Sequence, residues 1–133
     1  HWMVHSFPTR RSSDLFVEDM EIKITPAEFA LYWLLATIAK NGQPPIRGHK
    51  ALHEEFRSFC LSISPQTMPE LTNNQKFQNK NEDDMSEIAR SLSEKIKASL
   101  SSKDYLNYCL PTRDEGVYGI ALPPDSIICP RNY

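Results

Sequence analysis

Three stretches of the chain repeat their apolar residues at the spacing of an α-helix. The first begins at Pro26 and runs to about Asn41, with Gly42 as its stop, because glycine readily ends a helix. Thr25 precedes it as an N-cap and Glu28 follows three residues later, which predicts a capping box. The apolar residues cover more than one face and predict a helix enclosed on most sides: Phe29, Leu31, Tyr32, Leu34, Leu35, Ala36, Ile38 and Ala39.

Two further helices are predicted. One fits His49 to about Leu61, and the other covers residues 84–101. Between them, residues 62–84 are polar, rich in Asn and Gln, and carry two prolines, so we expect a long flexible loop. Each helix has one apolar stripe, which is Leu52, Phe56, Phe59 and Ile63 in the earlier helix and Met85, Ile88, Leu92, Ile96 and Leu100 in the later one.

Short strands are predicted on either side of the helices, because apolar and polar residues alternate there. Residues 112–116 separate the last two strands as a turn in which Gly116 can take a positive φ. The predicted strands are residues 20–25, 104–111 and 117–123.

The predicted order of elements is β-α-α-α-β-β, which is the order of a winged helix. We therefore expect an α+β, winged-helix-like domain over residues 16–133. Its second and third helices would form the helix-turn-helix pair. The unusual feature is the long insertion, residues 62–84, where a tight turn normally joins these two helices.

Residues 1–15 differ in character from the rest. The segment His5 to Leu15, HSFPTRRSSDL, has adjacent arginines, three serines and no apolar periodicity. All eleven of its residues resemble the translation of a common short-read sequencing adapter. We therefore expect residues 1–15 to be an artefactual or disordered leader and the remainder to be the tail of a longer protein. The alternative is a basic, disordered arm.

Composition narrows the class of protein. The formal net charge of −2 gives no general attraction for nucleic acid. Cys60, Cys109 and Cys129 are few, odd in number and widely spaced, which fits a reducing cytoplasm better than a disulfide framework. The most apolar run, Phe29 to Ala39, is much shorter than the roughly 20 residues that a bilayer requires, so we expect a cytoplasmic protein with no membrane contact.

One pair of side chains has the spacing of metal ligands. His49 and His53 lie four residues apart, so both rings could face one ion, and Glu54 and Glu55 are adjacent. Because no third ligand is evident, two solvated histidines are the favoured interpretation. The four glycines form no phosphate-binding loop, and no serine stands in a nucleophile elbow. We therefore assign no catalytic, cofactor-binding or metal-binding residue and expect no cofactor.

Three other groups of side chains are explained more simply by packing or by a helix start than by a catalytic or binding role. Cys60 and Cys109 adjoin aromatic residues, which favours packing over redox activity. Tyr32 and Trp33 belong to the wide apolar face, which favours core packing over stacking on a base. Three carboxylates fit the start of a helix better than a metal or acid–base cluster: Glu82, Asp83 and Asp84.

The charged residues of the predicted third helix and of the last turn give little support to DNA binding. A winged helix usually reads DNA through exposed residues of its third helix. Here that helix starts with acidic residues, which oppose the approach of phosphates. The turn between the last strands offers Arg113 but also Asp114 and Glu115. The exposed candidates on the third helix are Glu87, Arg90, Ser91, Glu94, Lys95 and Lys97.

Two sequence motifs near the ends of the domain are distinctive enough to compare with known families, and each is called a phrase below. They are ITPAEFALYWLLA, residues 24–36, and GVYGIALPPDSIIC, residues 116–129, with SLSEKIKASL, residues 91–100, between them. Residues 62–84 contribute no comparable phrase. The phrases are carried by Ile24, Pro26, Phe29, Ala30, Tyr32, Leu35 and Ala36, and by Tyr118, Gly119, Ile120, Leu122, Pro123, Pro124 and Ile127.

With these phrases the chain resembles the C-terminal part of CRISPR-associated ring nucleases, proteins of type III CRISPR antiviral defence that bind and cut cyclic oligoadenylate. In that family an N-terminal Rossmann-like domain, working as a dimer, binds and cuts the ring. Its motif glycines and Thr/Ser-rich loop have no counterpart here, so the resemblance carries no catalytic residue over to this chain.

The resemblance implies that residues 16–133 are an accessory domain, inactive alone, that packs against the Rossmann-like domain of a homodimeric parent. Part of the wide apolar surface of the first helix would then meet that missing partner.

Two alternatives stay open. Winged-helix domains of response regulators carry a phrase much like the first one and bind DNA in transcription regulation. Tyr32, usually leucine there, and the Pro123–Pro124 ending both distinguish this chain from them. The other alternative is an unrelated protein–protein interaction domain.

Overall fold

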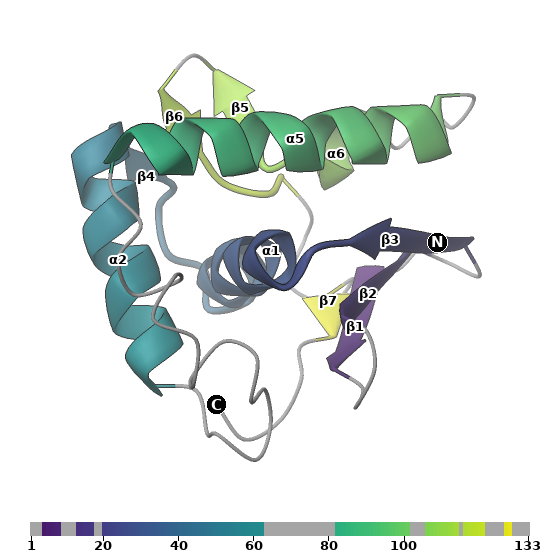
Figure 1. The fold of residues 1–133 in the computed structure, drawn as a ribbon, viewed down its shortest axis with the longest axis horizontal. Helices are drawn as coiled ribbons and strands as arrows, with labels where there is room; N and C mark the ends of the chain where they lie inside the picture. The colour runs from purple at the N-terminus through teal and green to yellow at the C-terminus, as the bar shows by residue number, and fades with distance from the viewer. Residues whose placement is uncertain are drawn as a thin grey trace.

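The structure is a computed structural model, and it describes residues 4–8, 13–17, 20–62, 82–101, 106–114, 116–121 and 127–128. It has an α+β fold (Figure 1). In chain order the elements are β1 (Val4–Pro8), β2 (Ser13–Val17), β3 (Met20–Ile24), α1 (Pro26–Lys40), β4 (Ile46–Arg47), α2 (His49–Ser62), α5 (Glu82–Leu100), α6 (Leu106–Cys109), β5 (Thr112–Asp114), β6 (Val117–Tyr118) and β7 (Ile127–Ile128).

Helix α1 has well-formed caps at both ends. The side chain of Thr25 accepts a hydrogen bond from the backbone N–H of Glu28 at 3.2 Å, and Glu28 Oε1 accepts one from the backbone N–H of Thr25 at 2.8 Å. The predicted capping box is thus confirmed. At the other end Gly42, with φ of 71°, donates to the carbonyl of Ala39, and the next N–H donates to the carbonyl of Ile38. These two bonds are those of a Schellman motif.

Helix α1 lies at the centre of the fold. Figure 1 views it nearly end-on, between α2, α5 and the strands β1 to β3. Every residue from 27 to 36 is buried, which confirms the prediction of an enclosed helix. Trp33 makes edge-to-face contacts with Phe29, at 5.9 Å between ring centroids, and with Phe59 of α2, at 5.2 Å. In the structure the chain itself, strand β2 included, buries this surface, and contact of α1 with a missing domain stays a prediction.

Helices α2 and α5 close the core with the apolar stripes that the sequence predicted. Helix α2 buries Leu52, Phe56 and Phe59 against α1. From α5 the buried side chains are Met85, Ala89, Leu92, Ser93, Ile96 and Leu100.

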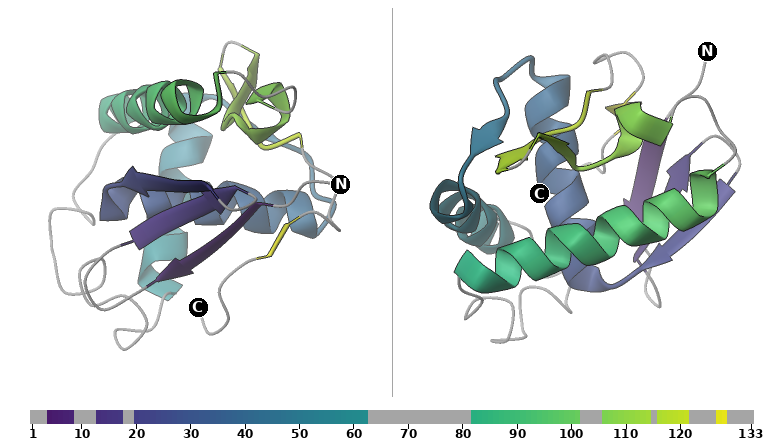
Figure 2. Two further views of the ribbon diagram at one scale, coloured as in Figure 1. Left: turned by 90° about the vertical axis from the view of Figure 1, so that its right-hand side faces the viewer. Right: turned by 90° about the horizontal axis from the view of Figure 1, so that it is seen from above.

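The described strands form two sheets. In the first the order is β3-β2-β1-β7, with β1 antiparallel to β2 and parallel to β7. The second is antiparallel in the order β4-β6-β5, and Ile46 of β4 pairs with Tyr118 of β6. Figure 2 shows, in its right-hand view, that the second sheet runs beside α5.

One predicted strand is replaced by a helical turn. Within residues 104–111, Leu106–Cys109 forms α6, and Thr112–Asp114 forms β5 rather than part of a turn. The physical reason lies in α1, because the buried Tyr32 hydroxyl donates to the Cys109 carbonyl at 2.7 Å. The helical turn directs Cys109 inward and leaves Tyr108 exposed. The last predicted strand is also shorter, since β6 covers only Val117–Tyr118.

Strand β4 was not predicted. Ile46 and Arg47 stand between two prolines and Gly48, and two residues are too few to show an alternating pattern. They become a strand because β6 offers backbone partners at Tyr118 and Val117.

The predicted loop, residues 62–84, and the predicted leader, residues 1–15, fall partly outside the described residues. Ser62 ends α2 and Glu82 begins α5, while residues 63–81, most of the predicted loop, lie outside. In the segment expected to be a leader, the backbone of β2 pairs with β1 and β3, in the register Val4↔Val17 and Ser13↔Ile24. Strand pairing in the protein does not show where the DNA that encodes this segment came from, so the adapter assignment stays a prediction.

Candidate functional site

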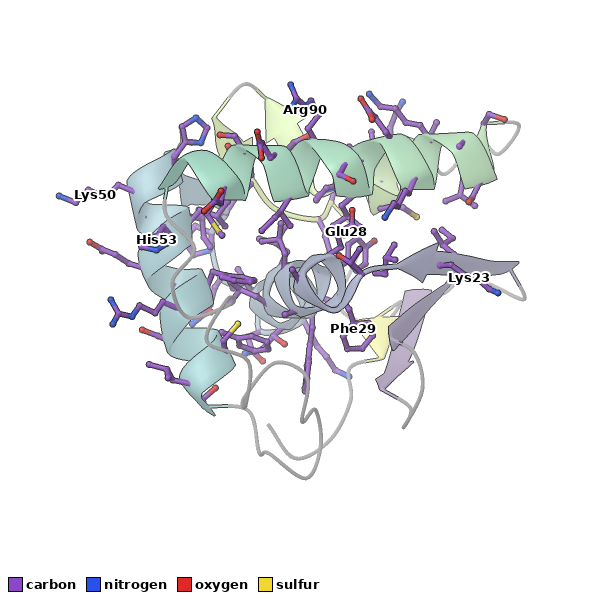
Figure 3. All side chains as sticks on the ribbon, viewed as in Figure 1. Lys23, Glu28, Phe29, Lys50, His53 and Arg90 are labelled. Carbon is purple, nitrogen blue, oxygen red and sulfur yellow. The ribbon has the colours of Figure 1, made fainter. Side chains whose placement is uncertain are left out.

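A pocket of about 410 Å³ lies between α5 and the second sheet. It is open to solvent, and Figure 3 shows one of its lining residues, Arg90, on the side of α5 that faces away from α1. Helix α5 forms one wall. The strands β5 and β6, their turn and the first residue of α2 form the other. The lining residues are His49, Ser86, Ala89, Arg90, Ser93, Lys97, Thr112, Gly116 and Tyr118.

The α5 wall is one stripe of a regular helix. Ser86, Arg90, Ser93 and Lys97 are spaced by four, three and four residues, so they lie on one face. Arg90 and Lys97 are exposed, and Ser93 is buried at the base of the pocket. The neighbouring apolar stripe of α5 packs into the core and thereby holds the polar stripe toward the sheet.

Backbone hydrogen bonds fix the hairpin wall. The N–H of Gly48 donates to the carbonyl of Gly116, and the N–H of Gly119 donates to the carbonyl of Pro111, each at 2.8 Å. Gly48 and Gly116 have φ of 90° and 76°, a region that favours glycine. The predicted positive φ at Gly116 is thus confirmed.

His49 is held at one end of the pocket. Its Nδ1 lies 2.6 Å from the Tyr118 hydroxyl, and the two rings are tilted, with centroids 5.8 Å apart. Ser86 Oγ lies 3.1 Å from Nδ1 and 3.3 Å from Nε2 of the same ring. Because Ser86 sits between the two nitrogens and Tyr118 already occupies Nδ1, the serine is not aligned with a single base as a nucleophile requires.

The described lining of this pocket contains groups that can bind an anion. Arg90 and Lys97 bring two positive charges, while Ser86, Ser93, Thr112 and Tyr118 bring hydroxyl groups. Among the lining residues whose side chains the structure describes, none carries a carboxylate. A guanidinium and an ammonium beside hydroxyl donors form charge-assisted hydrogen bonds to phosphate or carboxylate groups.

Helix α5 carries charges of both signs on its exposed side. Exposed Glu87 and Glu94 each lie three residues before one of the pocket cations, Arg90 and Lys97, so acidic and basic side chains are neighbours on the helix surface. Lys95, which we expected to be an exposed candidate for DNA, instead pairs with Glu28 of α1 at 2.6 Å. Figure 3 shows Glu28 between α1 and α5.

The carboxylate of Glu28 stays ionised inside this interface. Burial alone would raise its pKa, but hydrogen bonds from Lys95, Ser91 and the Thr25 backbone outweigh burial, and the pKa lies below its ordinary value. Only 3% of its side chain is exposed. The pair therefore ties α1 to α5 and fixes the wall of the pocket.

The structure places the two histidines of the pair in different surroundings. His49 belongs to the pocket through Tyr118 and Ser86, whereas His53 is half-buried one turn further along α2. Within the described ranges there is no group of three or more His, Cys, Asp or Glu side chains that could hold a metal ion.

The packing interpretations of Cys60, Cys109, Tyr32 and Trp33 are confirmed, because all four are buried. Burial raises the pKa of both thiols to about 12, so neither is a reactive thiolate near neutral pH. Burial, with Cys109 nearby, also raises the pKa of Tyr32. Cys129 lies outside the described residues.

The predicted acidic residues do occupy the first turn of α5, since the helix begins at Glu82. Sequence reasoning missed Ser86, Ser93, Thr112 and Tyr118 as pocket residues. The only available signal was the polar spacing along α5, because Thr112 and Tyr118 reach the site through the fold of the hairpin.

None of the described helices is both long and apolar enough to cross a bilayer. Comparisons of the chain with protein-family models, with curated proteins and with solved structures find no match.

Proposed function

We propose that residues 16–133 form a winged-helix-like accessory domain of a CRISPR-associated ring nuclease, a protein that degrades cyclic oligoadenylate in type III antiviral defence. The arrangement of α1, β4, α2, α5, β5 and β6 supports the winged-helix part of the proposal. In such a domain, a strand between the first two helices pairs with a C-terminal hairpin, which is the wing. Here β4 pairs with β6 in the sheet order β4-β6-β5.

The observation that carries the proposal is that the two family-like phrases fold against each other. Leu35 of the first phrase and Gly119 and Ile120 of the second line one small apolar cavity. Ile120 and Tyr118 are buried in the same core as Phe29 and Leu35. Residues more than eighty positions apart thus pack together in one structural unit.

The phrases contribute core residues rather than reacting groups. Tyr32 uses its hydroxyl to hold the Cys109 carbonyl, and Phe29 packs on Trp33. This pattern supports an accessory role, in which ring cleavage belongs to a Rossmann-like domain elsewhere in the parent. In a dimeric parent, residues 16–133 would support the catalytic domain.

The test compares two proteins. Genomic DNA upstream of the Phe16 codon should encode a Rossmann-like domain in frame. The restored parent should convert cyclic tetra- or hexa-adenylate to linear products, whereas the 133-residue chain should convert neither. Cleavage by the short chain, or a parent without a Rossmann-like domain, would contradict the proposal.

A DNA-binding domain of response-regulator type is the second candidate. The observation that favours it is the exposure of Arg90 and Lys97 beside the hairpin. Against it, Glu87 and Glu94 are exposed on the same helix and Lys95 is engaged by Glu28. Salt-dependent binding to duplex DNA that persists at physiological ionic strength would select this candidate.

A further inference from the structure

We propose that the pocket between α5 and the β5–β6 hairpin is a binding site for a small organic phosphate of about the size of a nucleoside monophosphate. This site lies in the described chain itself, and the proposal does not depend on the parentage proposed above. It rests on the volume, the charge and the aromatic edge of the pocket.

The volume fits a small molecule. Pockets that bind small ligands usually have volumes of about 300–1,000 Å³, and this open pocket has a volume of about 410 Å³. A long duplex needs an open face, whereas here the hairpin covers one side of the α5 stripe. Ser93, which lines the pocket, is only 8% exposed.

The charge fits a phosphate. Arg90 and Lys97 lie two turns apart on one face of α5, about 10 Å along the helix axis. Both long side chains can converge on one phosphate group placed between them. Ser86, Ser93 and Thr112 supply neutral donors around that position, and no acidic residue is found among the lining residues whose side chains the structure describes. A dianion placed there gains from charge-assisted contacts with both cations.

The aromatic edge fits the organic part of the ligand. His49 and Tyr118 close one end of the pocket, and their mutual hydrogen bond at 2.6 Å holds both rings in place. A planar ring or a ribose can pack on this edge while the phosphate reaches the cations. Recognition of a phosphate therefore supplies most of the affinity, and the rings add selectivity.

The experiment measures binding to the full chain by isothermal titration calorimetry, with AMP, ribose 5-phosphate and adenosine as probes. We expect AMP and ribose 5-phosphate to bind saturably and adenosine to show no binding. Arg90→Gln and Lys97→Gln should each weaken AMP binding about tenfold or more, because each removes one charge-assisted contact.

Matched controls are Arg57→Gln and Lys40→Gln, which remove the same charges from exposed positions outside the pocket. They should change AMP affinity less than about threefold. Circular dichroism verifies that all four variants keep their helices, as expected for exposed side chains. The proposal is overturned if neither phosphate binds, if adenosine binds as tightly as AMP, or if the control variants lose as much affinity as the pocket variants.

One further outcome would show that the pocket residues bind duplex DNA and not a small organic phosphate. Duplex DNA that binds the chain more tightly than AMP, and loses that binding in Arg90→Gln and Lys97→Gln, would make the stripe a DNA contact. The salt dependence distinguishes the two, because a duplex that spans several phosphates shows a steep salt slope and a single phosphate a shallow one.

Discussion

The Glu28–Lys95 pair is the sharpest test of how this fold is held together. Glu28 is 3% exposed, accepts from the Lys95 ammonium at 2.6 Å, and also accepts from the backbone N–H of Thr25 at 2.8 Å. Substitution of Glu28 by glutamine keeps a capping-box acceptor but removes the charge. Substitution by alanine removes both, and Lys95→Met removes the ammonium while keeping most of the apolar stem.

The structure sets the size of each effect. Loss of a buried, charge-assisted partner costs about 1.5–3 kcal/mol, and the lower half of that range applies because the side chain of Lys95 is 38% exposed to solvent. We therefore expect Lys95→Met to lower the free energy of unfolding by about 1.5–2 kcal/mol. Glu28→Ala should cost about 1 kcal/mol more than Glu28→Gln, since only alanine also loses the cap.

Urea unfolding, followed by far-ultraviolet circular dichroism, measures these values in a double-mutant cycle of Glu28→Gln and Lys95→Met. A coupling free energy of about 1–2 kcal/mol is expected, against about 0.5 kcal/mol or less for an exposed pair. A coupling within the exposed range would refute the reasoning, because the burial of Glu28 would then add nothing to the pair.

The same pair predicts a pH dependence. The pKa of Glu28 in the folded chain lies below the ordinary value of 4.5. Its contribution to stability is therefore fully present above pH 4.5 and is lost as the pH falls through the lowered pKa. The stability difference between wild type and Glu28→Gln should stay constant from neutral pH to about 5.5 and shrink below pH 4.5. A difference that grows with acidification contradicts the assigned sign.

Three further predictions concern other contacts. Tyr32→Phe leaves the buried carbonyl of Cys109 without its donor and should lower the free energy of unfolding by about 1–2 kcal/mol in urea melts; an effect below about 0.3 kcal/mol would contradict the 2.7 Å bond. Gly116→Ala places a Cβ at φ of 76° with no neighbour within 4 Å, so backbone strain alone should lower the free energy of unfolding by about 1–2 kcal/mol. Gly116→Asn should lower it less, because asparagine adopts a positive φ more readily. Equal stability of Gly116→Ala and wild type in thermal melts would rule out the turn geometry. The Cys60 thiol, whose pKa burial raises to about 12, should react with a thiol reagent at pH 8 at least about a hundredfold more slowly in the native chain than in urea, and comparable rates would show that it is exposed.

The sequence alone determined the helices and much of the core. Helix α1 could be placed within a residue because Thr25, Glu28 and Gly42 mark its ends through local hydrogen bonds and backbone freedom. The stripes of α2 and α5 followed from spacing, because a periodic apolar face has to be buried wherever the helix packs. Strand β3 was likewise predicted from the alternation of apolar and polar residues.

Only the tertiary structure decided the rest, because it depended on partners distant in sequence. Strand β4 exists through its pairing with β6, and α6 forms where Tyr32 holds the Cys109 carbonyl. The pocket has the same origin, since α5 supplies the cations while Tyr118 and His49 arrive from a hairpin and a helix that local patterns place separately. Local propensity acts over a few residues, whereas strand pairing and side-chain convergence are set by contacts across the fold.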